Sequence, residues 1–337
     1  MSESTGLKIA VVGATGLVGR TMLKVLEERQ IPCRELAPIA SAQSRGGEVH
    51  FNGRSYLLST LEDGEWEGSE VALFSAGSSV ASEWIPRISD TGVYCIDNSS
   101  AFRQEIGVPL VVPEVNDHDL MPNFRVIANP NCSTIQLVMV LGPLHKHFQL
   151  EEVVVATYQS VSGAGQRGLN QLLAERSGQT VDEPEFVKPI FDNIIPSIGK
   201  PAAHGLCFEE WKMIHETRKI LAADELRVYP FTVRVPVAYC HCEAVHLKFK
   251  EPVDVVGARE ILASAQGVTL MDDLANDVYP TPHDCVGKDD VFVGRLYQLP
   301  QDPTSLDCWI VSDNVRKGAA TNAVQILEAL IEKQYLK

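Results

Sequence analysis

The sequence predicts an α/β fold whose N-terminal part is a Rossmann-type dinucleotide-binding domain. A β-branched apolar run, Leu7–Val12, enters a glycine-rich loop that is followed by an amphipathic helix over Thr21–Glu28. Two later apolar runs, Val71–Phe74 and Val93–Ile96, each end in a small polar loop. This repeated order is typical of parallel strands whose C-terminal ends line a cofactor cleft. With 337 residues, the chain is long enough for two domains, each with its own core.

The loop after the first strand has the spacing GxxGxxG, which predicts a dinucleotide phosphate site. Gly13 permits a tight turn, Gly16 lets the backbone approach a pyrophosphate, and Gly19 lets the helix pack close to the strand. The helix N-terminus would then face the phosphates. The alternative is a plain tight turn.

A second strand, Glu35–Ala40, leads into the loop Ser41–Gly47, where an NAD enzyme usually carries an acidic residue for the ribose 2′-hydroxyl. The loop has no Asp or Glu. Its hydroxyls and one arginine suit a 2′-phosphate, so we expect NADP; the alternative is a solvated polar loop. The candidate contacts are Ser41, Gln43, Ser44 and Arg45.

The segment Asn129–Thr134 places Cys132 between a predicted strand, Phe124–Ala128, and a predicted helix. Pro130 favours an extended Asn129, and Asn131 can accept hydrogen bonds from the first helical turn. The helix dipole and the free amides would favour a thiolate and could hold the oxyanion of a carbonyl under attack. This arrangement predicts a nucleophile. The alternative is a small buried apolar residue, as expected for most of the eight cysteines.

The sequence changes character from residue 151. A strand over Val153–Ser160 carries Gln159 and leads through the glycine turn Val161–Gly165 to a helix, Gly168–Arg176. Residues 177–205 are rich in Pro, Gly and Asp, which predicts a long irregular segment without a core of its own. In the next helix, 209–221, four charged residues share one face: Glu209, Lys212, Glu216 and Lys219. We expect Glu216 and Lys219 to form a solvated ladder of ion pairs.

Residues 228–250 are rich in strand formers and contain Arg234 and the triplet Cys240-His241-Cys242. Successive strand residues point to opposite faces, which separates His241 from both cysteines, so no metal is expected. A histidine satisfied within the core is the alternative. Arg234 and His241 can face one substrate only if Pro236 or a bulge bends the segment, and we expect that bend.

Near the C-terminus, strands are expected over Val291–Leu299 and Leu306–Val311. The polar turn Asp313–Gly318 then opens a terminal helix, Ala319–Glu332. Its small apolar face predicts packing against the first domain.

Composition excludes several classes of function. The net charge of −15 argues against nucleic-acid binding, and no apolar run is long enough to span a membrane. The N-terminus has no signal-peptide pattern and the cysteines have no disulfide spacing, so we expect a cytoplasmic protein with free thiols.

The motifs GATGLVG, NPNCST, QSVSGAG, EEWK, the pair Arg234 and His241, and SDNVRKGAA occur in this order and resemble those of the aspartate-β-semialdehyde dehydrogenase family. The similarity spans nearly the whole chain. One departure is the loop SAQSRGG, where the resemblance leads us to expect an arginine at Gln43, so either Arg45 substitutes or the preference for NADP is weaker. The implied site residues are catalytic Cys132 and His241; substrate-binding Gln159, Glu209 and Arg234; phosphate-binding Arg103 and Lys212; and cofactor-binding Gly13, Thr15, Gly16, Leu17, Val18, Ser41, Gln43, Ser44, Arg45, Ser162, Gly163 and Asn314.

The resemblance implies NADPH-dependent reductive dephosphorylation of L-aspartyl-4-phosphate to L-aspartate-4-semialdehyde, in biosynthesis of lysine and diaminopimelate, threonine and methionine. The chemistry agrees, because a thioester on Cys132 is reactive enough to accept hydride. A histidine can serve as both acid and base, and the planar cation of Arg234 suits an α-carboxylate. For Arg103 taken alone, a solvated surface arginine is the alternative.

The family resembles glyceraldehyde-3-phosphate dehydrogenase in architecture, with an α+β catalytic and dimerisation domain after the nucleotide-binding domain. We therefore expect an NADP-binding domain over 1–131 and 314–337, a catalytic domain over 132–313, and a homodimer that binds a small-molecule substrate and inorganic phosphate. N-acetylglutamyl-phosphate reductase is an alternative, but members of that family have a sequence like GCYPT around the nucleophile, whereas this chain has NCST. A non-catalytic paralogue of the same fold is another.

Overall fold

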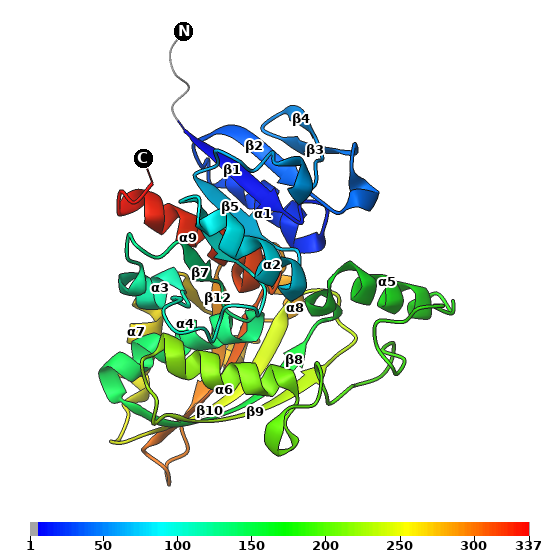
Figure 1. Cartoon of the computed structure of the whole chain (residues 1–337). Coiled ribbons are helices and arrows are strands. Elements are labelled where there is room, and N and C mark those ends of the chain that lie inside the picture. The colour runs from blue at the N-terminus through cyan, green and yellow to red at the C-terminus, as the bar shows by residue number, and fades with distance from the viewer. Residues whose placement is uncertain (1–5, 337) are drawn as a thin grey trace. The chain divides into compact units, whose positions relative to one another are not determined.

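The computed structural model describes residues 6–336, which form two compact units, each with its own sheet (Figure 1). The first unit contains the chain up to Pro130 and from Ala319 onward, and the second contains Asn131–Gly318. Asn131 and residues 314–318 thus belong to the second unit and not to the first. The local reason is that Asn131 caps the helix after it, and the N–H of Gly318 donates to the carbonyl of Asp313.

The first unit is a doubly wound parallel sheet. Its elements are β1 (Leu7–Val12), α1 (Leu17–Glu28), β2 (Cys33–Ile39), β3 (Glu48–Phe51), β4 (Arg54–Leu57), β5 (Val71–Phe74), α2 (Ser78–Ser89), β6 (Tyr94–Asp97), α3 (Pro113–Asn116), β7 (Val126–Ala128) and α9 (Thr321–Glu332). The strand order is β2-β1-β5-β6-β7, and every neighbouring pair is parallel. The predicted Rossmann-type domain is confirmed.

Alternate residues of β1 explain why helices cover both faces of this sheet. Ile9 and Val11 pack in one core with residues of α1 and α9, whereas Ala10 and Val12 pack in the other with residues of α2. A strand buried on both faces is continuously apolar, as β1 is. The prediction that the terminal helix packs against the first domain is confirmed. Asn322 of this helix also donates a 2.9 Å hydrogen bond to the carbonyl of Val111.

The second unit contains a mixed sheet. Its elements are α4 (Cys132–Phe148), β8 (Leu150–Gln159), α5 (Gly165–Arg176), α6 (Phe208–Ile220), β9 (Arg227–Arg234), β10 (His241–Phe249), α7 (Val255–Ser264), β11 (Val268–Leu270), α8 (Pro282–Cys285), β12 (Val291–Tyr297) and β13 (Ser305–Ser312). The order is β11-β12-β13-β10-β8-β9, with β8 parallel to β9 but antiparallel to β10. The expected α+β domain is confirmed.

Helices lie over one face of the mixed sheet (Figure 1). α4 contacts β8, β10, β12 and β13, while α6 contacts β9 and α7 contacts β11. On the opposite face the side chains of Val154, Tyr158 and Tyr297 are exposed. Among residues 6–336, no helix combines the length and the apolar character needed to cross a membrane.

Several element boundaries differ from the predicted ones. α1 begins at Leu17, four residues before the predicted Thr21, because the glycine loop already forms the first turn. The β3–β4 hairpin was not predicted. Its turn residues Asn52 and Gly53 both have positive φ (49° and 71°), the conformation that an Asn-Gly pair favours in a tight hairpin, so a local signal was present.

Candidate active site

The glycine loop has the geometry of a phosphate cradle. Gly13 has φ +89°, and a Cβ on it would lie 2.5 Å from the carbonyl oxygen of Ser75; a Cβ on Gly19 would lie 2.0 Å from the carbonyl oxygen of Gly13. Gly16 is the N-cap of α1 and provides no side-chain cap. The first amides of α1 are therefore open to an anion, as a bound pyrophosphate requires.

The predicted adenosine-end loop lies beside this cradle. The amides of Gly13 and Ala14 donate to the carbonyl of Ile39, the last residue of β2. After β2 come Ser41, Gln43 and Arg45, which are exposed, and Ser44, which is partly exposed.

An acidic residue that the sequence did not reveal stands at this loop. Asp63 lies 2.5 Å from a guanidinium nitrogen of Arg45. The other carboxylate oxygen of Asp63 accepts from the amide and hydroxyl of Thr60. These hydrogen bonds, with Arg45, lower the pKa of Asp63 despite partial desolvation. Asp63 thus holds the Arg45 guanidinium at the loop.

Arg103 lies in the first unit and is buried, with 7% of its surface exposed. Its guanidinium donates to the carbonyl of Asn98 at 2.8 Å, just beyond β6. The alternative of a solvated surface arginine is wrong, because the side chain is buried and its guanidinium is bonded to the loop after β6.

Cys132 begins α4, as predicted. Asn131 is the N-cap, and its side-chain oxygen accepts from the amides of Ser133 and Thr134 at 3.0 and 3.2 Å. Cys132 is partly exposed, whereas six of the other seven cysteines are buried. A Cβ on Gly318 would lie 3.0 Å from the Cβ of Cys132, so this glycine leaves room beside the thiol. The position is that of a reactive thiol at a helix N-terminus.

Three predicted residues lie side by side at one end of three neighbouring strands of the mixed sheet. Gln159 ends β8 and pairs with Arg234, which ends β9. His241 begins β10 on the other side of β8, one position beyond the Cys242–Tyr158 pair. Arg234 and His241 are seven residues apart and would face opposite sides of one unbroken strand. They are instead on two different strands, with β8 between them, so both can face one substrate. The expected bend is present: residues 235–240 are outside any strand, the amide of Val237 donates to the carbonyl of Val235, and Cys240 has φ +70°.

Arg234 and His241 converge above Gly163. A Cβ on Gly163 would lie 2.7 Å from Nη1 of Arg234 and 3.0 Å from Nε2 of His241. Arg234 donates to the carbonyl of Ser160 at 2.7 Å. Burial lowers the pKa of Arg234, while Glu209 and Cys132 raise it, so both are close enough to act on its charge. The backbone at Gly163 leaves space where these side chains meet.

His241 is fully buried and neutral. Burial and the nearby Arg234 cation lower its pKa to about 3, although Glu209 and the carbonyl of Cys240 act in the opposite direction. Its Nδ1 lies 3.1 Å from both the amide nitrogen and the hydroxyl of Ser160.

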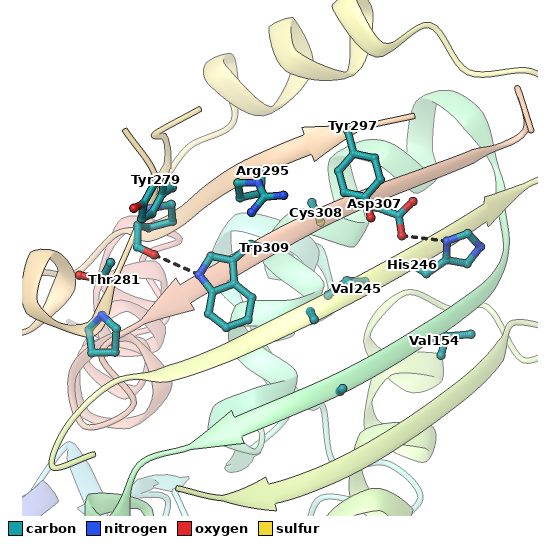
Figure 2. Close-up of a pocket in the computed structure, with 14 residues that line it drawn as sticks. Val154, Val245, His246, Tyr279, Thr281, Arg295, Tyr297, Asp307, Cys308 and Trp309 are labelled. Carbon is teal, nitrogen blue, oxygen red and sulfur yellow. Dashed lines mark hydrogen bonds and ion pairs between the residues drawn. The ribbon is translucent and has the colours of Figure 1, made fainter. Parts of the chain in front are cut away.

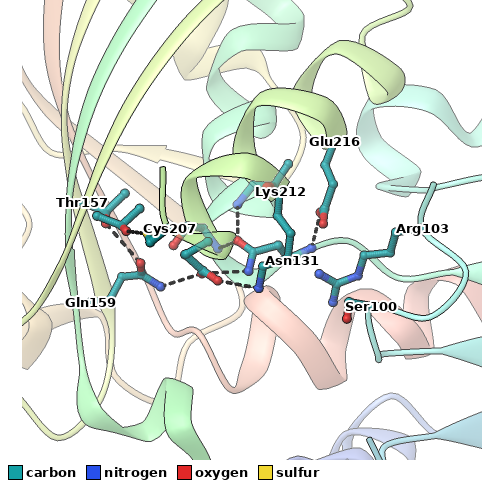
Figure 3. Close-up of polar contacts among 12 residues, drawn as sticks. Ser100, Arg103, Asn131, Thr157, Gln159, Cys207, Lys212 and Glu216 are labelled. Atoms are coloured by element: carbon teal, nitrogen blue, oxygen red, sulfur yellow. Dashed lines mark hydrogen bonds and ion pairs between the residues drawn. The ribbon is translucent and has the colours of Figure 1, made fainter. Parts of the chain in front are cut away.

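Glu209 is the centre of a buried polar network in the second unit, and its partners Asn131, Gln159 and Lys212 are labelled in Figure 3. Its Oε1 accepts from Gln159 at 2.9 Å and from the side chain of Asn131 at 2.8 Å, and its Oε2 lies 2.5 Å from Nζ of Lys212. Burial would raise the pKa of Glu209, but Lys212, Gln159 and Asn131 together lower it to about 2. The site therefore carries a fixed carboxylate. Gln159 is oriented by Thr157, whose hydroxyl donates to its amide oxygen.

Glu216 does not lie in a solvated ladder of ion pairs, and that prediction is wrong. The residue is fully buried, and its Oε2 accepts from the backbone amide of Asn131 at 2.6 Å. Helical spacing indicated which face of α6 Glu216 occupies but not that the turn before Cys132 covers that face. Glu216 is a site residue that sequence reasoning missed; for Asn131 the cap was predicted, but not its hydrogen bonds to Glu209 and Glu216.

Ser162 and Asn314 lie together in the same unit. Nδ2 of Asn314 donates to the hydroxyl of Ser162 at 3.0 Å, and Oδ1 of Asn314 accepts from the amide of Cys240 at 3.0 Å. Both residues are buried.

The side chains of Cys240 and Cys242 pack with Cys285, Phe292 and Val311 in a hydrophobic cluster that does not include His241. Within residues 6–336, no group of three or more His, Cys, Asp or Glu side chains is placed to hold a metal ion.

The uncovered face of the mixed sheet carries a pocket of about 580 Å³ (Figure 2). Its lining is mainly apolar and includes Val154, Ala244 and Trp309. The indole N–H of Trp309 donates to the carbonyl of Pro280, and His246 lies 3.0 Å from Asp307. None of the predicted site residues lines this pocket.

The chain matches two domain families in tandem. Residues 8–122 match the semialdehyde dehydrogenase NAD binding domain, and residues 141–317 match the semialdehyde dehydrogenase dimerisation domain. Aspartate-semialdehyde dehydrogenase of Legionella pneumophila is 44% identical over 341 residues, covering 99% of this chain and 98% of its own. The enzyme of the same name from Aquifex aeolicus is also 44% identical, covering 97% and 99%.

Solved structures agree with these matches. The crystal structure of aspartate semialdehyde dehydrogenase II from Vibrio cholerae complexed with ASA has a TM-score of 0.94 at 41% identity, covering 98% of this chain and 99% of that one. A probable aspartate-semialdehyde dehydrogenase from Pseudomonas aeruginosa has a TM-score of 0.91 at 29% identity, covering 98% and 100%. Because these similarities extend over nearly the whole chain, the protein belongs to the aspartate-semialdehyde dehydrogenase family.

Proposed function

We propose that the protein catalyses NADPH-dependent reductive dephosphorylation of L-aspartyl-4-phosphate to L-aspartate-4-semialdehyde through a thioester on Cys132, in the biosynthesis of lysine, threonine and methionine. The observation that carries this proposal is the position of Cys132 at the N-terminus of α4, close to Arg234, which converges with His241 above Gly163. A thiol, a planar cation and an imidazole are the groups that this acyl transfer needs.

Each residue has a role in the proposed reaction. Cys132 attacks the acyl carbon of the substrate and phosphate leaves, while the amides of α4 stabilise the oxyanion. Arg234 binds the α-carboxylate of the aspartyl group, and the Glu209 carboxylate with Gln159 binds its ammonium. Arg103 and Lys212 bind the phosphate. His241 donates a proton to the oxygen of the thioester carbonyl as that carbonyl is reduced.

The residues of the first unit fit a nicotinamide dinucleotide. The uncapped amides of α1 would hold its pyrophosphate, and Gly13 and Gly19 stand where side chains would clash with the backbone. When bound, NADPH supplies the hydride for the reduction. We propose NADP as the cofactor because Arg45, fixed by Asp63, offers a cation for a 2′-phosphate.

We further propose that the protein is a homodimer formed through the uncovered face of the mixed sheet. The match to a dimerisation domain over residues 141–317 supports this, as do the exposed Val154 and Tyr297, which line the pocket of Figure 2, and the exposed Tyr158, whose ring contacts that of Trp309. Isolated exposed apolar residues are ordinary, whereas a contiguous apolar face is typical of an interface.

A steady-state assay tests the function. Purified protein is incubated with L-aspartate-4-semialdehyde, NADP and inorganic phosphate, and NADPH formation is followed by absorbance. We expect turnover that saturates with phosphate and is abolished in Cys132→Ser, which should fold and bind NADP like the wild type. Turnover with N-acetylglutamate semialdehyde in place of aspartate semialdehyde, or full activity in Cys132→Ser, would contradict the proposal.

A further inference from the structure

Among residues 6–336, Ser160 alone places hydrogen-bond donors within reach of Nδ1 of His241. The amide nitrogen and the hydroxyl of Ser160 both lie 3.1 Å from Nδ1. A backbone amide can only donate, so Nδ1 must be the acceptor, and in the neutral ring the proton then sits on Nε2. The directed amide contact therefore favours the Nε2–H tautomer of His241, against the nearby carbonyl of Cys240, which favours a protonated ring.

The Nε2 atom is buried and has no hydrogen-bond partner among the described residues. It faces the space above Gly163, where Arg234 also points. In this tautomer, His241 presents an N–H to that space. It can give a proton to a substrate oxygen, but it has no lone pair on Nε2 with which to take one.

A hydroxyl pathway reaches the opposite side of the ring. The Ser160 hydroxyl lies 3.0 Å from the hydroxyl of Ser162, which in turn accepts from Asn314 at 3.0 Å. The Ser160 hydroxyl also lies 3.0 Å from Oδ1 of Asn314, so it can rotate between two acceptors, Nδ1 and Oδ1. Ser160 and His241 are fully buried, whereas Ser162 keeps 3% of its surface exposed, so bulk water meets this path at Ser162 and not at Nδ1.

We propose that Ser160 is a positioning residue that fixes the Nε2–H tautomer of His241 and relays the replacement proton to Nδ1 during reduction. As the thioester carbonyl is reduced, the Nε2–H bond breaks and an O–H bond forms on the oxygen. The Ser160 O–H bond breaks and an Nδ1–H bond forms. Ser160 regains a proton from the Ser162 hydroxyl, which regains one from water, so this step takes up one proton from solvent.

The ring then has the opposite tautomer, with a lone pair on Nε2. It can accept the hydroxyl proton of the thiohemiacetal on Cys132 as the thiolate leaves and the aldehyde forms. Nδ1 returns its proton to Ser160, which passes its own hydroxyl proton back through Ser162 to water, so the proton taken up during reduction is released and the starting state is restored. This inference rests on the proposed function for its chemical step, but the tautomer is a property of the free protein.

The first test is nitrogen-15 NMR of the free wild-type protein with labelled histidine at pH 7.5. We expect His241 to be neutral, with the proton on Nε2, and the Nδ1 shift typical of an unprotonated nitrogen that accepts a hydrogen bond. A neutral ring carrying its proton on Nδ1 would overturn the inference, whether or not the protein has the proposed activity.

The second test compares Ser160→Ala and Ser160→Thr with Ser312→Ala. Ser312 is a suitable control because it is buried, pairs with His241 across the sheet, and has a hydroxyl without a partner among the described residues. We expect Ser160→Ala to lower kcat at least about tenfold, with an enlarged solvent deuterium isotope effect and unchanged KM for NADP. Ser160→Thr should restore most of kcat.

A kcat for Ser160→Ala within about twofold of the wild type, or a loss equal to that of Ser312→Ala, would overturn the relay. If Ser160→Ala fails to fold, the NMR measurement still decides the tautomer, because it uses the wild-type protein. Ser160→Thr then tests the relay, because it keeps the hydroxyl in the buried site. Absence of turnover in the wild type would instead refute the proposed function and leave the tautomer assignment standing.

Discussion

The backbone amide of Asn131 donates a 2.6 Å hydrogen bond to the buried carboxylate of Glu216. The side chain of the same asparagine caps α4 and donates to Glu209. Asn131 therefore ties the turn that carries Cys132 to two residues of α6 that lie about two helical turns apart. A nucleophile at a helix N-terminus needs this fixed backbone, because a small displacement of the reacting atom costs rate.

Replacing Glu216 should test this connection. Glu216→Ala leaves a buried amide unpaired and should lower the free energy of unfolding by about 1.5–3 kcal/mol, measured by urea denaturation. Glu216→Gln keeps an acceptor and should lose less. Glu225→Ala, at an exposed glutamate after the same helix, should change stability by no more than about 0.5 kcal/mol. If Glu216→Ala were as stable as Glu225→Ala, the hydrogen bond to Asn131 would have no structural importance.

The lowered pKa of His241 predicts a pH dependence of stability. The folded state binds its proton only near pH 3, whereas the unfolded chain binds one near pH 6.5, so acidification favours unfolding between these values. The stability that the protein gains from keeping His241 neutral is fully present above pH 6.5. It is lost as the pH falls, because the unfolded chain takes up the proton first. His241→Gln should therefore flatten the rise of unfolding free energy between pH 5 and 6.5 by up to about 1.4 kcal/mol per pH unit.

Urea denaturation across pH 5–8 measures that slope. His283→Gln, at an exposed histidine, is the matched control and should leave it unchanged. Equal slopes in His241→Gln and the wild type would mean that His241 can take up a proton in the folded protein.

Prediction from sequence succeeded where the signal was local. The glycine loop and the Asn131 cap each lie within seven residues, and their backbone requirements can be read directly from residue types. Predictions that depended on packing were less successful. Whether Glu216 meets solvent or the Cys132 turn depends on contacts 85 residues apart in the chain. Likewise, Asp63 meets Arg45 across 18 residues, so the composition of the loop alone could not reveal it.

Cofactor preference should depend on Arg45. We expect the wild type to favour NADP over NAD by at least about tenfold in kcat/KM, since a charge-assisted contact contributes about 1.5–3 kcal/mol. Arg45→Ala should remove most of that preference by weakening NADP, and Asp63→Ala should reduce it partly by freeing the guanidinium. Arg54→Ala, at an exposed arginine of β4, is the control. An unchanged ratio in Arg45→Ala would locate the discrimination elsewhere.

Phosphate dependence should separate Arg103 from Lys212. Arg103→Leu should raise the KM for phosphate about ten- to a hundredfold without altering NADP affinity. Lys212→Leu should raise the KM values for both phosphate and aspartate semialdehyde, because Lys212 also pairs with Glu209 at 2.5 Å.

Initial rates at varied phosphate provide the measurement, with exposed Lys200→Leu as a control that should behave like the wild type. Unchanged phosphate saturation in both variants would remove Arg103 and Lys212 from the phosphate site.

The most direct test of the thioester on Cys132 is a rapid-mixing experiment without phosphate. The protein is mixed with L-aspartate-4-semialdehyde and excess NADP, and NADPH is followed by absorbance before the reaction is quenched for mass spectrometry. We predict a burst of about one NADPH per protomer, an aspartyl adduct on Cys132, and continued turnover only after phosphate is added. Continuous NADPH formation without phosphate, no burst, or an adduct on another residue would contradict the mechanism.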